Sequence, residues 1–194
     1  MESNANASAD KVAIVTASGS GMGAACTREL AGRGYAVALM STSGKAEALV
    51  KQLGGLGLTG SVRKEADLEA LVGGTLERYG RVDGVVNSTG HLASGEVLEL
   101  TDGQWHEAFD LVVLNVVRIA RLVTPTMVRQ GGGAIINVST FSAFEPSLTF
   151  PLSSSLRAAL AGFAKLYADR YAADSGRSTA PARISLRIVL GVSP

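Results

Sequence analysis

The chain has 194 residues, 46% of them hydrophobic, and its 18 basic and 17 acidic side chains leave a formal net charge of +1. This length favours one domain with a substantial core, and the balanced charge, without a run of like charge, argues against a nucleic-acid or anionic-membrane surface. We therefore expect a small-molecule substrate as the partner, with no nucleic acid and no membrane.

The first residues and the cysteine content bear on where the protein works. The opening ten residues, MESNANASAD, lack the basic and apolar segments of a signal peptide, and the single cysteine, Cys26, excludes an intramolecular disulfide. No apolar run reaches the roughly 18 residues of a membrane-spanning helix. These features predict a soluble, cytoplasmic protein in which Cys26 is a small core residue.

The apolar pattern predicts the order of strands and helices. Residues 1–9 are polar and are expected to form a flexible arm before a single domain at 10–194. Four runs, KVAIVT, YAVALM, DGVVN and AIINVS, are continuously apolar, which is typical of strands covered on both faces. Between them the sequence predicts helices at about 22–33, 44–54, 66–79, 102–130 and 152–173. This alternation predicts a three-layer α/β domain around a parallel sheet.

The segment at 102–130 is the longest predicted helix. It is preceded by leucine and opens with TDGQW, so Thr101 or Asp102 is expected to be its N-cap. Pro125 is expected to end or kink the helix. His106 is expected to pack at an interface.

A glycine-rich stretch, TASGSGMGAAC, directly follows the first predicted strand. Gly19, Gly21 and Gly23 let the backbone turn tightly and approach a bound phosphate just before a helix begins. The free N–H groups at a helix N-terminus favour an anion. Between the first strand and the first helix of an α/β chain, such a loop favours a dinucleotide site over an ordinary tight turn.

From this loop onward the chain resembles the short-chain dehydrogenase/reductase family. That family opens with Thr-Gly-x-x-x-Gly-x-Gly, which corresponds to residues 16–23, with Ala17 in place of the first glycine and Gly19 expected to supply flexibility nearby. The family's Asn-Asn-Ala-Gly corresponds to NSTG at 87–90, and GAIINVST resembles its fifth strand. The resemblance spans roughly residues 11–173 and implies a Rossmann-type doubly wound parallel sheet.

The resemblance also implies a function. Members of the family are NAD(P)-dependent oxidoreductases that act on a carbonyl group or a secondary alcohol, and they assemble as homodimers or homotetramers. No metal site is implied. The positions expected to bind the cofactor are Thr16, Ser18, Gly19, Ser20, Gly21, Met22, Gly23, Ser41, Thr42, Ser43, Ser61, Val62, Asn87, Ser88, Gly90 and Arg157.

The end of the second predicted strand bears on which dinucleotide binds. An acidic residue there would bond the adenosine ribose hydroxyls and repel a 2′-phosphate, but the sequence has Ser41. The residues behind it are Thr42, Ser43 and Lys45. Because hydroxyls and a lysine can hold a phosphate, NADP is predicted, with NAD as the alternative. The same STSG stretch could instead be only a helix N-cap and turn.

The catalytic positions depart from the family pattern. Aligning SSSLRAAL with the family's Tyr-x-x-x-Lys-Ala-Ala-Leu puts Ser153 at the tyrosine and Arg157 at the lysine. Thr140 then takes the place of the family's serine, and Asn115 matches its asparagine. A serine hydroxyl is less acidic and shorter than a phenol, and arginine does not give up its proton. The resemblance therefore implies cofactor binding with an atypical, weakened catalytic centre.

Two alternatives stay open from the residues alone. His91 follows NSTG and could supply the acid/base group that Ser153 lacks. Tyr167 and Tyr171 cannot, because they lie about four to five helical turns further along, at least about 20 Å away. The chain could also be a non-catalytic dinucleotide-binding protein that acts as a sensor or an assembly partner.

Two further expectations concern assembly and the end of the chain. The two longest predicted helices are expected to pair with a second copy, because apolar residues such as Val112, Val116 and Phe163 cover more of their circumference than one sheet face would bury. Residues 173–194 lack the family's Asn and Pro-Gly and form an atypical C-terminal segment. Within it, RISLRIVLGV is expected to form a sixth strand.

Overall fold

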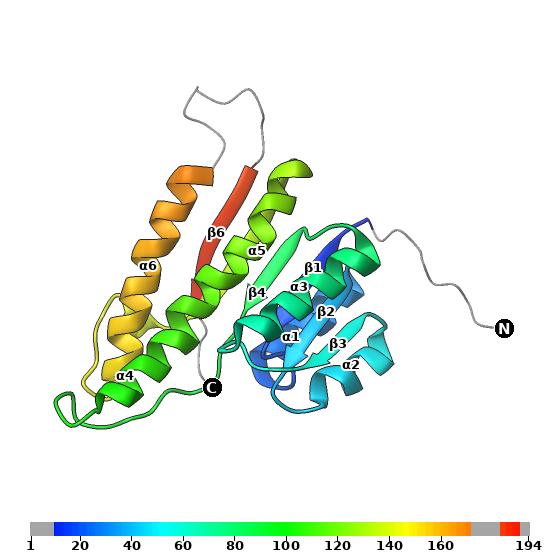
Figure 1. The fold of residues 1–194 in the computed structure, drawn as a ribbon. Helices are drawn as coiled ribbons and strands as arrows, with labels where there is room; N and C mark the ends of the chain where they lie inside the picture. The colour runs from blue at the N-terminus through cyan, green and yellow to red at the C-terminus, as the bar shows by residue number, and fades with distance from the viewer. Residues whose placement is uncertain (1–9, 172–182, 191–194) are drawn as a thin grey trace.

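Six strands form one parallel sheet in the order β3-β2-β1-β4-β5-β6 in the computed structural model, which describes residues 10–171 and 183–190 (Figure 1). The strand order runs outward from β1 in both directions, so the predicted Rossmann-type doubly wound α/β fold is confirmed. The strands are β1 Val12–Thr16, β2 Ala36–Ser41, β3 Leu56–Thr59, β4 Gly84–Asn87, β5 Gly132–Ser139 and β6 Arg183–Leu190.

The predicted sixth strand is also confirmed, because RISLRIVL forms β6 and pairs in parallel with β5. The arm expected at 1–9 lies outside the described residues. The same is true of the C-terminal segment on either side of β6, at 172–182 and 191–194.

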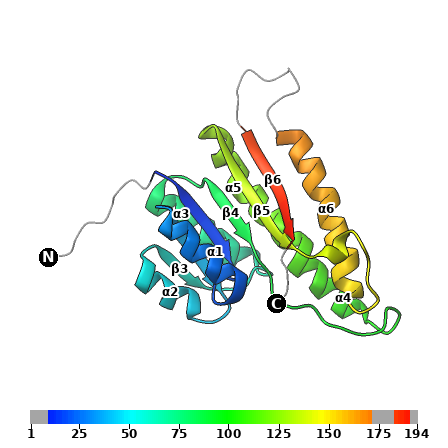
Figure 2. The ribbon, with the colours of Figure 1, turned by 180° about the vertical axis from the view of Figure 1, so that it is seen from behind.

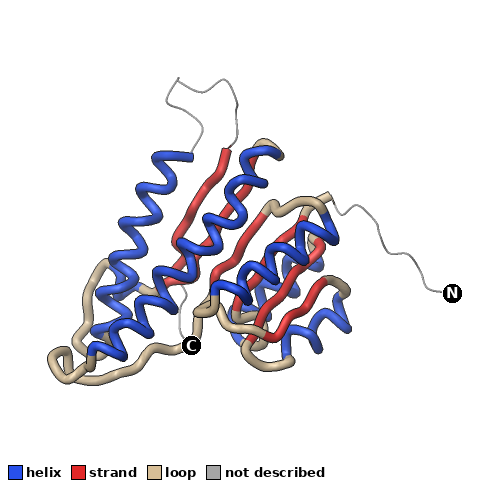
Figure 3. Tube along the Cα trace, in the orientation of Figure 1, coloured by secondary structure: helices blue, strands red, loops and turns tan. Residues whose placement is uncertain are grey.

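The described helices form a layer on each face of the sheet (Figure 3). Helices α1 and α2 pack on one face, and α3, α5 and α6 pack on the other. A π-helical turn, η1, joins α4 to α5, and a short 3-10 helix, η2, precedes α6. Their bounds are α1 Gly21–Gly32, α2 Lys45–Leu53, α3 Glu65–Tyr79, α4 Asp102–Phe109, η1 Asp110–Leu114, α5 Asn115–Arg129, η2 Phe141–Ala143 and α6 Pro151–Tyr171.

Successive residues of each central strand enter different layers of the core. Ile14 and Val85 belong to the cluster that includes α5, whereas the next residues, Val15 and Val86, belong to the cluster on the α1 and α2 side. The central strands are therefore buried on both faces, which explains why their sequences are apolar without alternation. Figure 2 shows the face of the sheet that carries α1 and α2, and on this face the two helices do not extend over β6. Val189 of β6 is accordingly 48% exposed.

The segment predicted as one long helix contains α4, η1 and α5. Thr101 is its N-cap, and the Thr101 hydroxyl and the Gln104 side chain form a reciprocal capping box. The expectation that Pro125 could end the helix is wrong, because α5 continues to Arg129. Buried packing on both sides of the proline, by Val123 and Met127, offsets the missing backbone hydrogen bond.

This helical run, Asp102–Arg129, is also long and apolar enough to cross a membrane, with a mean hydropathy of 1.6 over its most apolar window. However, 56% of that window is buried inside the protein. Length and composition do not distinguish such a buried core helix from a membrane span.

The apolar residues expected to face a second copy are partly used inside the chain. Val112 and Val116 are 1% exposed and pack against Leu152, Leu156 and Leu160 of α6. The expectation that these two valines remain for an intermolecular contact is therefore wrong, because the N-terminal half of α6 covers them.

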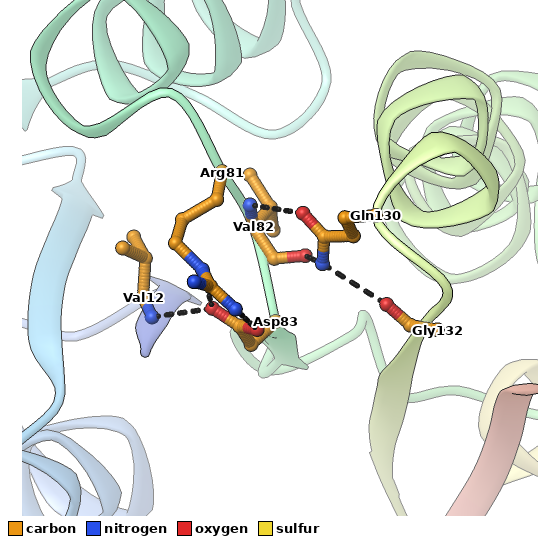
Figure 4. Close-up of polar contacts among 6 residues, drawn as sticks. All are labelled: Val12, Arg81, Val82, Asp83, Gln130 and Gly132. Carbon is orange, nitrogen blue, oxygen red and sulfur yellow. Dashed lines mark hydrogen bonds and ion pairs between the residues drawn. The ribbon is translucent and has the colours of Figure 1, made fainter. Parts of the chain in front are cut away.

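The amino-terminal end of β4 is fixed by a network of polar contacts (Figure 4). The Asp83 carboxylate accepts hydrogen bonds from the Val12 backbone N–H at 2.8 Å and from the Arg81 guanidinium at 2.7 and 2.9 Å. These contacts tie the start of β1 to the start of β4. The Asp83 hydrogen bond also raises the pKa of Arg81, so the guanidinium stays charged.

Gln130 makes the second part of this network, just after α5. Its side-chain nitrogen donates to the carbonyls of Val82 at 2.6 Å and Gly132 at 2.9 Å, and its oxygen accepts from the Val82 N–H at 3.3 Å. One amide thereby joins the end of α5 to β4 and β5 (Figure 4).

We predict that Gln130→Ala lowers the free energy of unfolding by about 1–3 kcal/mol, because it leaves half-buried backbone groups without partners. Urea denaturation measures the change. Arg121→Ala is the control on α5, since among the described residues the Arg121 side chain makes a long, exposed ion pair with Glu65 and no hydrogen bond, and its loss should cost less than about 0.5 kcal/mol. Equal losses for the two variants would contradict the role assigned to Gln130.

Candidate functional site

A cavity of about 450 Å³ lies at the carboxyl ends of β1, β2, β3 and β4. Most of the predicted cofactor positions that have exposed surface meet there, although they come from four separate turns. The predicted residues that line the cavity are Gly19, Ser20, Ser41, Thr42, Ser43, Ser61, Val62 and Gly90. Its volume is in the range of small-molecule sites in proteins.

Two requirements shape the glycine loop, namely close contact between α1 and the backbone at Ala17 and a positive φ at individual residues. A Cβ on Gly23 would lie 2.4 Å from the Ala17 carbonyl oxygen, so only glycine fits where α1 packs on the loop. Gly21 has a φ of +53°, in the left-handed region. Ala17 itself has a φ of +48°, which explains why the family has glycine there.

Gly19 has a packing role beside the flexibility expected of it, which stays a prediction. The absence of a side chain admits neighbours, because a Cβ on Gly19 would lie 3.0 Å from Lys45 Cβ and 3.1 Å from Ser41 Cβ. The start of α2 therefore packs directly on the glycine loop. Ala17 keeps its positive φ as a local strain of about 1–2 kcal/mol.

The N-terminus of α1 faces this cavity through Ser20. Ser20 is exposed and extended, and its side chain makes no capping hydrogen bond. The first amides of α1 therefore have no side-chain acceptor among the described residues, and the positive end of the helix dipole is open to a phosphate. The loop and the cavity fit the adenosine and phosphate part of a dinucleotide.

Three of the predicted cofactor residues hold the loop in place through buried hydrogen bonds. The Thr16 hydroxyl donates to the Ser88 carbonyl at 2.9 Å and accepts from the Ser88 N–H at 3.1 Å. The backbone N–H and the hydroxyl of Ser18 both bond the Met40 carbonyl, at 3.1 and 3.2 Å. These contacts fix the ends of β1, β2 and β4 relative to one another. By contrast, Met22 is 48% exposed on α1.

The STSG turn combines a cap with an open surface. The Ser41 hydroxyl accepts from the Ala46 N–H at 3.0 Å and donates to the Ser43 carbonyl, and Ser41 is 7% exposed. Ser41 therefore caps the first turn of α2, as the alternative interpretation of STSG predicted. Thr42, Ser43 and Lys45 are exposed and line the cavity, without an acidic side chain among them.

Arg157 is the best-anchored of the four catalytic candidates. Its Nε donates to the Ser153 hydroxyl at 3.1 Å, Nη1 donates to the Val138 carbonyl at 2.8 Å, and Nη2 lies 3.4 Å from the Thr89 hydroxyl. One guanidinium thus connects α6, β5 and the turn after β4. Arg157 makes these contacts from three different nitrogen atoms, whereas a lysine would have to make them from a single ammonium nitrogen.

Burial lowers the pKa of Arg157 without removing its charge. The residue is 8% exposed and makes no ion pair with the carboxylates of the described residues. Desolvation lowers the pKa of its guanidinium from its usual value, but arginine stays protonated in proteins. Arg157 can therefore hold and polarise neighbouring groups, but it cannot relay a proton.

Thr140 and Asn115 do not hydrogen-bond to Ser153 or Arg157. The Thr140 hydroxyl bonds Ser142, and the Asn115 side-chain nitrogen donates to the Leu111 carbonyl at 2.6 Å within its own helix. The structure therefore brings Ser153 and Arg157 together but leaves the other two candidates in separate local contacts.

Several buried polar atoms near these residues lack a partner among the described contacts. They are Asn87 Oδ1, Asn115 Oδ1, Asn137 Nδ2 and Ser139 Oγ. Asn87 and Asn137 lie opposite each other in register and share one hydrogen bond of 2.9 Å. Asn137 and Ser139 face the same side of β5. Buried polar groups without a partner are rare, and each needs an explanation such as a bound water or a functional role. The sequence analysis did not single out Asn137 and Ser139, although their alternate spacing in INVS places both side chains on one face of a strand.

The two histidines and the cysteine considered in the sequence lie at three different places in the structure. His91 is exposed and lines the cavity, so it stays available as an acid/base group. His106 is exposed on α4. Cys26 is half-buried on α1 and packs against the core on that side of the sheet, so its expected place in the core is only partly realised.

A family model described as short chain dehydrogenase matches residues 11–179. The chain belongs to the short-chain dehydrogenase family. This membership agrees with the glycine loop, the NSTG turn and the strand order, and it defines the chain as a member of a family of oxidoreductases.

Three comparisons place the chain within this family. It is 34% identical over 167 residues to the human dehydrogenase/reductase SDR family member 4, covering 82% of this chain and 60% of that protein. L-sorbose reductase from Gluconobacter frateurii, complexed with NADPH and L-sorbose, superposes with a TM-score of 0.77 at 30% identity, covering 82% of this chain. A short-chain dehydrogenase from Streptomyces avermitilis superposes with a TM-score of 0.83 at 27% sequence identity, covering 93% of this chain. The chain spans 60% of the human relative and 64% of each of these structures.

We predict that Gly23→Ala destabilises the protein by about 1–3 kcal/mol and weakens dinucleotide binding, because the new Cβ would displace the Ala17 carbonyl. Gly32→Ala is the control in the same helix, where no atom lies within 4 Å of the added Cβ, and its stability should be unchanged or slightly higher. Thermal unfolding and calorimetric titration measure both effects. A Gly23→Ala variant that behaves like Gly32→Ala would rule out the close approach.

Proposed function

We propose that the protein is an NAD(P)-dependent oxidoreductase that acts on a carbonyl group or a secondary alcohol, with a weakened catalytic centre. The observation that carries the proposal is the cavity beside the glycine loop, onto which the open N-terminus of α1 faces. Family membership supports the same reaction class. The weakening follows from Ser153 and Arg157, which stand where a phenol and an amine would do acid/base work.

NADP is the proposed cofactor. The turn after β2 presents two hydroxyls and Lys45 to the cavity and no carboxylate that would repel a 2′-phosphate. The solved complex of L-sorbose reductase contains NADPH, which is consistent with this proposal. Calorimetric titration with NADPH and NADH measures the preference directly.

The chain's own groups have limited roles in the chemistry. When bound, the nicotinamide would supply or accept a hydride. Thr140 offers a hydroxyl that can donate to the substrate oxygen, whereas Arg157 holds Ser153 and the turn at Thr89. Ser153 is left as the proton donor, and an alkyl hydroxyl is a weak acid. We therefore propose slow turnover with intact cofactor binding.

We predict that Ser153→Tyr combined with Arg157→Lys raises kcat for a carbonyl substrate by about 10²- to 10⁴-fold, the usual contribution of general acid catalysis. Both changes are needed together, because the tyrosine requires the lysine and the lysine alone would abandon the contacts of Arg157. Steady-state kinetics with NADPH across a panel of ketones and aldehydes measures the gain.

Ser155→Tyr is the matched control, since Ser155 is exposed on the same helix and should leave the rate unchanged. Cofactor titration shows whether each variant remains folded. A wild-type rate typical of efficient enzymes, or no effect of Ser153→Ala on turnover, would make His91 the proton donor to test. Binding without turnover in any variant would instead support the non-catalytic dinucleotide-binding alternative.

We also propose that the protein pairs with a second copy through the outer faces of α5 and α6. An apolar groove of about 630 Å³ runs between these helices, and its lining includes Val117, Val128, Phe163 and Leu166. Leu166 is 71% exposed, and exposed apolar surface of this kind favours protein contact.

Leu166→Asp is predicted to shift the protein from dimer or tetramer to monomer, because the contact would have to bury a carboxylate. Light scattering at micromolar concentration measures the mass. Leu98→Asp is the control, since Leu98 is 93% exposed and lies outside both helices. A wild-type protein that is already monomeric would reject this proposal.

A further inference from the structure

Arg63 is a cavity residue that none of the sequence motifs includes. It follows β3 and lines the same cavity as Lys45, Thr42 and Ser43. Its backbone is held from two sides, since its N–H donates to the Ser61 hydroxyl at 3.3 Å and its carbonyl accepts from Arg118 at 3.2 Å. The guanidinium is therefore carried on a fixed stem at the edge of the cavity.

Within the part of the chain that the structure describes, the Arg63 side chain has one weak partner. Its Nη1 lies 3.5 Å from Glu107 Oε2 on α4, and the two side chains are 47% and 73% exposed. Such pairs contribute little and are screened by salt. The other carboxylate nearby, Asp110, is held at 2.6 Å by Arg118 and does not compete. Most of the five guanidinium donors of Arg63 are thus available to a stronger anion.

Lys45 brings a second positive charge to the lining of the cavity. Its Cβ is fixed against Gly19, and it follows β2, which lies between β1 and β3 in the sheet. Lys45 and Arg63 therefore emerge from neighbouring strand ends, with the hydroxyls of Thr42 and Ser43 beside them. Two cations and two hydroxyls around one cavity are complementary to a phosphate group.

We propose that Arg63 leaves Glu107 and binds the adenosine 2′-phosphate of NADP together with Lys45. The inference rests on the proposed function, and it adds Arg63 as a specificity-determining residue and Glu107 as its competitor. A phosphate attracts the guanidinium more strongly than the long contact to Glu107, because it carries more charge and accepts two hydrogen bonds at once.

The test uses two adenosine ligands that differ in the 2′-phosphate, namely 2′,5′-ADP and 5′-AMP, titrated calorimetrically into the whole chain. Arg63→Ala is expected to weaken 2′,5′-ADP binding by about 10- to 100-fold, the value of a charge-assisted hydrogen bond, and to leave 5′-AMP unchanged. NADPH and NADH should show the same difference.

Glu107→Gln is expected to strengthen 2′,5′-ADP binding by about two- to fivefold, because it removes the competing carboxylate. Lys64→Ala is the matched control. Lys64 is next to Arg63 in the sequence but lines a separate groove with His106 and Phe109, and it is not part of the cavity lining. Its loss should therefore leave the affinity for both ligands unchanged at physiological salt.

Equal weakening of 2′,5′-ADP and 5′-AMP in Arg63→Ala would place Arg63 on the adenine and overturn the proposal. No effect on either ligand would also overturn it. A wild-type chain that binds neither NADPH nor NADH would reject the proposed function and this inference with it, whereas binding of both with no selective effect of Arg63→Ala would reject this inference alone.

Discussion

Every strand pair of the sheet runs parallel, so the chain must return through a helix after each strand. The carboxyl ends of all these strands therefore lie at the same end of the sheet. The register then decides which side chains meet there. Val15 lies opposite Val86, and Asn87 lies opposite Asn137. As a result, the glycine loop, the NSTG turn and Thr140 come to the same edge although they are far apart in the chain.

The end of the sheet where the strands begin and the end where they finish differ in how their polar groups are hydrogen-bonded. At the amino-terminal end of the sheet, Asp83 and Gln130 pair with backbone groups of β1, of β5 and of the segment that leads into β4 (Figure 4). At the carboxyl end of the sheet, buried side-chain atoms of Asn87, Asn137 and Ser139 have no hydrogen-bond partner among residues 10–171 and 183–190. Hydrogen bonds therefore hold the strands at both ends of the sheet, since Thr16, Ser18 and Arg157 join the carboxyl ends. Of the two ends, only the carboxyl end has buried side-chain polar atoms without a partner in the described part of the chain.

The sequence predicted the sheet, the helices and the glycine loop because these depend on local patterns of apolar residues and glycines. It could not predict contacts that join distant segments, such as those of Arg157 with Thr89 and with Val138. The cap formed by Ser41 was only one of two interpretations, since both use the same residues. Arg63 gave no signal because one charged loop residue forms no pattern.

The contact between Arg157 and Ser153 makes these two positions a coupled pair. Tyrosine at 153 alone would remove the serine hydroxyl that accepts from Arg157 Nε, and lysine at 157 alone would remove the guanidinium that donates to the Val138 carbonyl. Each single substitution would therefore lose a contact without completing the family's Tyr-x-x-x-Lys pair. The effects of substitutions at positions 153 and 157 are therefore expected to be non-additive, because each residue supplies one partner of a contact that the other completes.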